Sequence, residues 1–266
     1  MQFSFVKYQA TGNDFLALDN REGQFQGAGT PEQQTFWARA CDRHFGVGGD
    51  GVLLIGPQQE PNTDFHLLYL NADGLQGSFC GNGSRAAVHY AKELGLFGGN
   101  ATRFSAADGI HRAELDLQTG YIRSELLIRA EAQQHPTGDW FIHTGSPHVV
   151  RFVTDAEGLE VVARGRAIRH APEYSPGGTN VNFVQVMPDG KLRVRTYERG
   201  VEDETLSCGT GVTAASIVHQ LTSHCEWPVR VLTKGGELCV YYRDQSYWLE
   251  GPAQAVFEGT YPASLV

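Results

Sequence analysis

Residues 80–91 read CGNGSRAAVHYA, and residues 208–219 read CGTGVTAASIVH. In each copy a cysteine is followed by Gly-Asn-Gly or Gly-Thr-Gly, and then by a run without Gly or Pro that places small apolar residues at helical spacing. This pattern predicts a helix that is entered through a glycine turn, with the thiol at its start. Because the copies lie half a chain apart, they indicate an internal duplication and two related lobes.

The predicted position of the thiols has chemical consequences. The first N–H groups of a helix lack intrahelical partners and carry the positive end of the helix dipole. A thiolate is favoured there, and the same N–H groups can hold a carboxylate. Two such helix starts facing each other would hold one small anion between two sulfurs. One sulfur would then take a proton from a carbon while the other returned one to the opposite face, which makes Cys80 and Cys208 the candidate acid/base pair.

The simpler interpretation is that each cysteine is a small buried residue, as free cysteines commonly are. The repeated surroundings argue against it, since Asn71 and Arg199 each lie in a polar turn nine residues before their cysteine. A disulfide between Cys80 and Cys208, acting as a redox switch, stays open as an alternative. No CxxC or Cys/His ligand spacing supports a metal site, so none is predicted.

Composition limits the class of protein. The chain has 266 residues, is 41% hydrophobic and carries a formal net charge of −9. It can bury one large core or two smaller ones, and the duplication favours two. The lack of a basic run argues against a nucleic-acid partner. No apolar stretch reaches the length of a membrane span, and the N-terminal sequence does not resemble a secretion signal. Five cysteines without framework spacing are typical of a reducing cytoplasm.

Strand and turn patterns fill most of the remaining sequence. Helices are expected at 30–44, from Cys80 to about Leu96, within 156–164 and after Cys208. Strands are expected around 3–5, 15–18, 52–55, 64–71, 102–106, 110–117, 121–128, 140–143, 149–153, 181–186, 191–197, 229–232, 238–242, 247–249 and 255–258. The predicted fold class is α+β, with two pseudo-symmetric lobes, each a mixed or antiparallel sheet wrapped around a central helix. We expect residues 1–119 with 257–266 to form the lobe that carries Cys80, and residues 120–256 the lobe that carries Cys208.

A glycine-rich turn, FGVGGDG at 45–51, could suggest a phosphate-binding loop. However, no Gly-Lys-Ser/Thr follows, and a strand comes next where such a loop would lead into a helix. Nucleotide binding is therefore not predicted. The glycines are expected to let the backbone pass close to a ligand or to a neighbouring helix.

The chain as a whole resembles diaminopimelate epimerase, the cofactor-independent amino-acid epimerase of lysine and peptidoglycan biosynthesis. The resemblance rests on these motifs: GNDF at 12–15, NADG at 71–74, CGNGSR at 80–85, SPH at 146–148, GTNVNF at 178–183, YERGVEDETLSCGTG at 197–211, TKGG at 233–236 and the closing GPAQAVFEG. It implies the diaminopimelate epimerase-like fold and interconversion of LL- and meso-diaminopimelate without a cofactor. The alternative is another racemase or isomerase of the same fold, of the proline racemase or phenazine-biosynthesis type. Proline racemases, however, have His where this chain has Asn82.

The resemblance also implies a role for each matching residue. Cys80 and Cys208 would exchange protons with the α-carbon. Backbone N–H groups for the α-carboxylate would come from Gly81, Asn82, Gly209 and Thr210. The distal amino-acid end of the substrate would be bound by Asn13, Asn71, Asn180 and Arg199. The pKa values of the thiols would be adjusted, and the α-amino group bound, by His148 and Glu198.

The chain departs from many of these relatives at three places. Relatives often have Gln where this chain has Gly51 and Asn where it has Ser146, and the stretch between Glu198 and Cys208 is one residue longer here. We expect these changes to affect distal recognition and not the two-cysteine chemistry. The expected partner is a small diamino diacid, with no nucleic acid and no membrane. The family further implies a homodimer in the cytoplasm.

Overall fold

The computed structural model describes residues 2–25, 30–128 and 131–262. The chain divides into two compact units, Met1–Ser124 with Pro252–Val266 as unit 1, and Glu125–Gly251 as unit 2. Residues 1, 26–29, 129–130 and 263–266 of the predicted lobes lie outside the described residues.

The strand pairing explains where the division falls. The chain passes from unit 1 to unit 2 after Ser124 and not at the expected 119/120. The reason is that the first residues of β7 (Ile122–Leu126) pair antiparallel with β6 (Gly109–Leu115) of unit 1. The chain returns to unit 1 at Pro252, before the expected 257, because β17 (Gln254–Pro262) pairs with β1 (Gln2–Ala10) from Gln254 onward.

The two units share one order of elements, strand-strand-helix-strand-strand-helix-strand-strand, and unit 2 has additional short elements within it. Besides β1, β6 and β17, unit 1 contains β2 (Asn13–Asp19), α1 (Pro31–Cys41), β3 (Gly51–Gly56), β4 (Phe65–Asn71), α2 (Gly81–Glu93) and β5 (Ala101–Ala106), and β7 begins in unit 1 and ends in unit 2. Unit 2 contains β8 (Gln133–Gln134), β9 (Trp140–His143), β10 (Pro147–Phe152), α3 (Val161–Arg169), the 3₁₀ turn η1 (Pro172–Tyr174), β11 (Asn180–Val186), β12 (Leu192–Glu198), β13 (Asp203–Thr205), α4 (Gly209–Ser223), β14 (Val229–Thr233), β15 (Gly236–Arg243) and β16 (Ser246–Gly251).

The pairing pattern shows the duplication directly. In unit 1, β1–β2, β3–β4 and β5–β6 are antiparallel, whereas β2–β3 and β4–β5 are parallel. In unit 2, β9–β10, β11–β12 and β14–β15 are antiparallel, whereas β10–β11 and β12–β14 are parallel. A parallel pair needs a crossover connection, and in both units a helix lies in each crossover. α2 and α4 therefore occupy equivalent places, and the predicted α+β fold with two related halves is confirmed.

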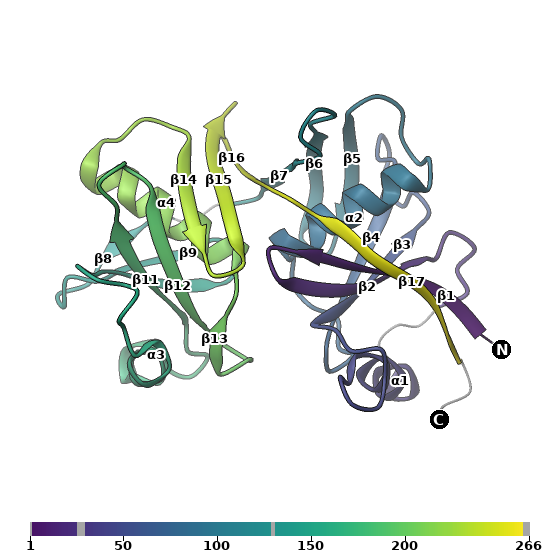
Figure 1. Cartoon of the computed structure of the whole chain (residues 1–266), viewed down its shortest axis with the longest axis horizontal. Helices are drawn as coiled ribbons and strands as arrows, with labels where there is room; N and C mark the ends of the chain where they lie inside the picture. The colour runs from purple at the N-terminus through teal and green to yellow at the C-terminus, as the bar shows by residue number, and fades with distance from the viewer. Residues whose placement is uncertain (1, 26–29, 129–130, 263–266) are drawn as a thin grey trace. The chain divides into compact units, whose positions relative to one another are not determined.

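Each unit buries its strands between two helices (Figure 1). In β3, Val52 and Leu54 pack in one core cluster with Trp37 of α1. Leu53 lies on the other face, where its Cδ2 approaches Gly83 of α2. Because both faces are covered, the strand is apolar along its length rather than alternating. α2 and α4 contact several strands of their own unit, which is the central-helix arrangement that the sequence predicts.

Three helices differ from the predicted bounds. α2 ends at Glu93, before the expected Leu96, because Gly95 adopts a positive φ of 71° that ends the helix. α3 begins at Val161 and not within 156–160, because the Asp155 carboxylate accepts from the backbone N–H groups of Glu157 and Gly158 and holds that stretch as a turn. α1 ends at Cys41, before the expected 44, because the Asp42 side chain accepts from the next backbone N–H groups and favours a turn there.

Gly51 opens β3 at a place where a side chain has no room. A Cβ there would lie 2.5 Å from the backbone oxygen of Leu70 and 2.6 Å from Cε2 of the Tyr69 ring. We expect Gly51→Ala to lower the free energy of unfolding by about 1–3 kcal/mol, because the Leu70 carbonyl belongs to the β3–β4 ladder and cannot move freely.

The matched control for this prediction is Gly56→Ala, at the other end of the same strand. There the nearest atom to an added Cβ is the backbone oxygen of His66, 3.8 Å away. Urea unfolding of both variants measures the difference, and equal losses would contradict the steric argument.

Candidate active site

Both predicted acid/base cysteines lie at a helix start. Cys80 is the N-cap of α2, and its Sγ accepts a hydrogen bond from the backbone N–H of Gly83 at 3.3 Å. Cys208 is the N-cap of α4, and its Sγ lies 3.5 Å from the Thr210 hydroxyl. Neither helix has an acidic residue in its first turn. The helix N–H groups and dipole therefore favour a thiolate, or a bound carboxylate, at both positions.

In unit 1 the structure brings Asn13, Cys80 and Asn82 together. The Asn13 Oδ1 atom is 3.8 Å from the Cys80 sulfur and 3.3 Å from Asn82 Nδ2. On its other side, Asn13 Nδ2 donates to Asp50 Oδ2 at 2.7 Å. Because an ionised carboxylate only accepts, this bond fixes the orientation of the Asn13 amide.

Asp50 is a site residue that the sequence reasoning missed. It lies in the glycine-rich turn before β3, in which a role was predicted for the glycines alone. Besides Asn13, the Asp50 carboxylate accepts from Arg43, at 2.8 Å. The turn therefore places a paired carboxylate behind Asn13, and the missed signal was the aspartate within the turn.

Arg85 is the second residue that the sequence reasoning missed. Its side chain is fully buried on α2 and donates to Gly81 O at 3.1 Å, Thr11 Oγ1 at 3.2 Å and Asn82 Oδ1 at 2.9 Å. Burial lowers the pKa of Arg85 to about 10, partly offset by the nearby Cys80 sulfur. The guanidinium stays charged at neutral pH and holds the first turn of α2 in place. An arginine directly before the apolar run Ala86-Ala87-Val88 was the available signal.

In unit 2 the structure brings His148, Thr210 and Cys208 together. His148 Nε2 is 2.9 Å from Thr210 Oγ1, which in turn is 3.5 Å from the Cys208 sulfur. Burial, followed by the charges of His143 and Arg199, lowers the pKa of His148 to about 3. The imidazole is therefore neutral at physiological pH and can serve as a hydrogen-bonding group but not as a cation.

The remaining predicted residues lie at strand ends. Asn180 opens β11, where its Nδ2 donates to Pro147 O at 3.0 Å and its Oδ1 accepts from the Arg199 N–H at 2.9 Å. Glu198 closes β12 and accepts from the Thr205 hydroxyl at 2.8 Å, while Arg199 is exposed. Asn71 closes β4, and its Oδ1 lies so close to Gly77 that an added Cβ there would approach it to 2.8 Å. Asn180 thus uses its amide to position the turn that carries Arg199.

The buried neutral His148 predicts a pH dependence of stability. Its pKa is 6.5 in the unfolded chain and about 3 in the folded one, so between these values only the unfolded chain takes up the proton. The free energy of unfolding should therefore fall as the pH drops from 6.5 toward 3.

The measurement compares wild type and His148→Gln by urea unfolding at pH 7 and pH 5. His66 and His219, whose pKa values burial also lowers, are present in both proteins and contribute equally. We expect the variant to lose less stability over this range. Equal losses would show that His148 is protonated in the folded state.

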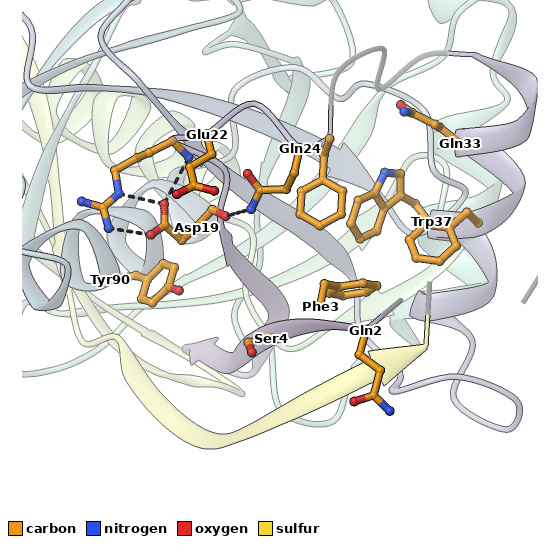
Figure 2. A pocket seen from close by; sticks show the side chains of 12 residues that line it. Gln2, Phe3, Ser4, Asp19, Glu22, Gln24, Gln33, Trp37 and Tyr90 are labelled. Carbon is orange, nitrogen blue, oxygen red and sulfur yellow. Dashed lines mark hydrogen bonds and ion pairs between the residues drawn. The ribbon is translucent and has the colours of Figure 1, made fainter. Parts of the chain in front are cut away.

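A large open pocket of unit 1 lies elsewhere. It encloses about 980 Å³, and its lining includes neither Cys80 nor Asn13. Figure 2 shows the rings of Phe3 and Trp37 on one side and Asp19 on the other. The Asp19 carboxylate is already paired with Arg21 at 2.6 Å, and neither predicted acid/base cysteine lines this pocket.

The fold is shared with solved structures of other proteins. The phenazine biosynthesis protein of the PhzF family from Bacillus anthracis superposes with a TM-score of 0.73 at 14% identity, covering 98% of this chain and 99% of that one. A hydroxyproline epimerase from Agrobacterium vitis superposes with a TM-score of 0.73 at 13% identity, covering 97% and 92%. At this identity the likeness establishes the fold class, that of the diaminopimelate epimerase-like proteins.

Sequence comparison identifies the family within that class. The profile of the family described as Diaminopimelate epimerase matches residues 5–124 and 140–256. The diaminopimelate epimerase of Flavobacterium psychrophilum is 40% identical over 261 residues, covering 96% of this chain and 98% of its own length. That of Aquifex aeolicus is 40% identical over 269 residues, covering 96% of each chain. The chain belongs to the diaminopimelate epimerase family.

Proposed function

We propose that this chain interconverts LL- and meso-diaminopimelate by proton transfer at the α-carbon, using Cys80 and Cys208 and no cofactor, in lysine and peptidoglycan precursor biosynthesis. The observation that carries the proposal is the placement of one cysteine at the same helix start in each half of a chain of this family. One cysteine, as the thiolate, accepts the α-proton. The other, as the thiol, donates a proton to the opposite face of the same carbon, and the roles exchange in the reverse direction.

The backbone N–H groups of both helix starts support this chemistry. Removing the α-proton builds negative charge toward the α-carboxylate, and fixed N–H donors stabilise that charge. We assign this task to Gly81 with Asn82 and to Gly209 with Thr210. His148 acts on Cys208 through Thr210, and Glu198 contributes to α-amino binding. The backbone N–H groups at the two helix starts provide the stabilisation that a pyridoxal cofactor gives in other amino-acid enzymes.

The distal end of the substrate is assigned to Asn13, Asn71, Asn180 and Arg199. An uncharged amide can accept from an ammonium and donate to a carboxylate, and an arginine can fork a carboxylate. Reading this second amino-acid end gives selectivity for a diamino diacid over a shorter amino acid.

The test of the proposed function is a deuterium-exchange assay in D₂O. Purified protein is incubated with LL-diaminopimelate, proline or lysine, and α-deuterium and stereochemistry are followed by mass spectrometry and NMR. We expect deuterium and inversion with LL-diaminopimelate alone. Turnover of proline instead would assign the chain to another racemase of the same fold, and no exchange with any substrate would refute the proposal.

Arg199→Lys tests the distal carboxylate. The exposed guanidinium is replaced by a single ammonium, so a forked contact becomes a point charge. We expect KM for LL-diaminopimelate to rise about tenfold or more, as expected for a loss of about 1.4 kcal/mol in binding, with the unfolding midpoint unchanged. An unchanged KM would remove Arg199 from substrate binding.

We further infer that the enzyme works in the cytoplasm as a homodimer. None of the five cysteines, all of which lie among the described residues, is joined in a disulfide, which fits a reducing compartment. Val256 and Phe257 of β17 are about half exposed, at 57% and 48%, and offer an apolar patch for a second copy. Light scattering of wild type and Phe257→Glu measures the mass, and a wild-type monomer would refute the dimer.

No helix among the described residues has the length and apolar character of a membrane span.

A further inference from the structure

Asn182 is a buried polar residue that has no assigned role in the proposed reaction. It lies in β11 between Val181 and Phe183, which pack in the core cluster beside α3. The alternation of a strand turns Asn182 to the opposite face, toward α4. Its side chain is 0% exposed, so every polar atom needs a partner.

The partners of Asn182 fix the orientation of its amide. Nδ2 donates to the backbone oxygen of Val149 at 2.9 Å, and a carbonyl oxygen can only accept. The Oδ1 atom accepts from the Thr196 hydroxyl at 2.9 Å. The second N–H of Nδ2 points to His148 Nδ1 at 3.1 Å.

This orientation determines the tautomer of His148. Because Nδ1 faces an N–H donor, it must present its lone pair, and the single proton of the neutral ring lies on Nε2. Nε2–H then donates to Thr210 Oγ1 at 2.9 Å, with Ser146 Oγ farther away at 3.4 Å. Since Thr210 Oγ1 accepts this bond, its own hydrogen is directed elsewhere, with the Cys208 sulfur at 3.5 Å and Ser146 Oγ at 3.3 Å in reach.

Gly211 lies directly against the Asn182 amide. A Cβ at Gly211 would collide with Asn182 Oδ1 and would lie 3.3 Å from Cε1 of His148. The first turn of α4 is therefore packed directly against both side chains. The bare backbone at this position allows the close approach, while the hydrogen bonds to Val149 and Thr196 set the orientation of the amide.

We propose that Asn182 is a positioning residue, which fixes the Nε2–H tautomer of His148 and so directs the Thr210 hydroxyl as a hydrogen-bond donor to the Cys208 sulfur. A donor to the sulfur stabilises its thiolate form. The inference deepens the proposed function, because it explains how Cys208 is prepared as the base, but its tests do not depend on turnover. His143 and Arg199 are the charged or titratable groups that act on His148.

The direct test is the ¹⁵N spectrum of the histidine rings in the full-length protein. We expect the His148 ring to show an unprotonated Nδ1 and a protonated Nε2. In Asn182→Asp the carboxylate can only accept, so it should draw the proton to Nδ1 and reverse the tautomer. A wild-type ring that carries its proton on Nδ1 would overturn the proposal.

The second test follows Cys208 itself. Alkylation by iodoacetamide across a pH series, read at Cys208 by peptide mass spectrometry, reports its thiolate fraction. We expect Asn182→Asp and Thr210→Val each to move the midpoint about one unit higher, which slows alkylation about tenfold below the midpoint. Thr210→Ser should restore the wild-type profile because it restores the hydroxyl.

Thr213→Val is the matched control on the same helix. Its hydroxyl is buried and bonds back to Gly209 O at 2.9 Å. We expect its Cys208 profile to match wild type. An equal shift of the Cys208 alkylation midpoint in Thr213→Val, or no shift in Thr210→Val, would overturn the proposed hydrogen bonds from His148 through Thr210 to Cys208. If Asn182→Asp does not fold, the comparison of the Cys208 alkylation profiles of Thr210→Val and Thr210→Ser tests the proposal. Failure of the proposed function would appear separately, as a wild type with the expected tautomer but no exchange of LL-diaminopimelate.

Discussion

Cys80→Ser and Cys208→Ser should each lower epimerisation of LL-diaminopimelate by at least about 100-fold, the lower end of the usual contribution of one acid/base group. A serine hydroxyl at either helix start keeps the size and the hydrogen bonds of the thiol, but its pKa is far too high to supply a base at neutral pH. Because both sulfurs lie at N-cap positions and not inside a core cluster, the variants should fold as wild type does. Deuterium incorporation and inversion in D₂O measure the effect.

Cys225→Ser is the control for this pair. Cys225 is another free, partly buried thiol, and it follows the end of α4 instead of preceding its start. Its substitution should leave epimerisation within about twofold of wild type, since surface changes away from a site have small effects. Full turnover in either Cys80→Ser or Cys208→Ser would remove the two-cysteine mechanism.

Arg85→Met should destabilise unit 1 more than any single surface change. The buried guanidinium donates to the Gly81 carbonyl, Thr11 and Asn82, and methionine removes all three of these hydrogen bonds. Hydrogen bonds to a charged group contribute about 1.5–3 kcal/mol each, and they are not additive, so we expect a loss of about 3 kcal/mol or more in the free energy of unfolding. Activity should fall as well, because the same bonds hold the first turn of α2.

Two further variants make this result specific. Arg85→Lys keeps the charge but loses the planar fork, so it should recover only part of the stability. Arg103→Met, at an exposed position of β5, should change the unfolding midpoint little. A loss below about 1 kcal/mol in Arg85→Met would show that water replaces the lost donors.

The sequence was informative where a local pattern repeats. The two Cys-Gly-x-Gly runs predicted both central helices and the position of each thiol, because helix starts depend on neighbouring residues. The helix at 156–164 was misplaced by several residues, because the Asp155 turn competes with helix formation over the same stretch. Glycine at 51 was expected to affect distal recognition, and only the structure shows that the Tyr69 ring and the Leu70 carbonyl leave no room for a side chain there.

The sequence by itself determined the duplication, the family and the two candidate acid/base residues, since these follow from the order of residues along the chain. The tertiary structure alone decided which polar groups support them. Asp50 reaches Asn13 from the turn before another strand, Arg85 connects α2 to Thr11, and Asn182 meets His148 across the β10–β11 pair. Such contacts join residues far apart in the chain, and their distances and hydrogen-bond directions exist only once the strands are paired and the helices are packed against them.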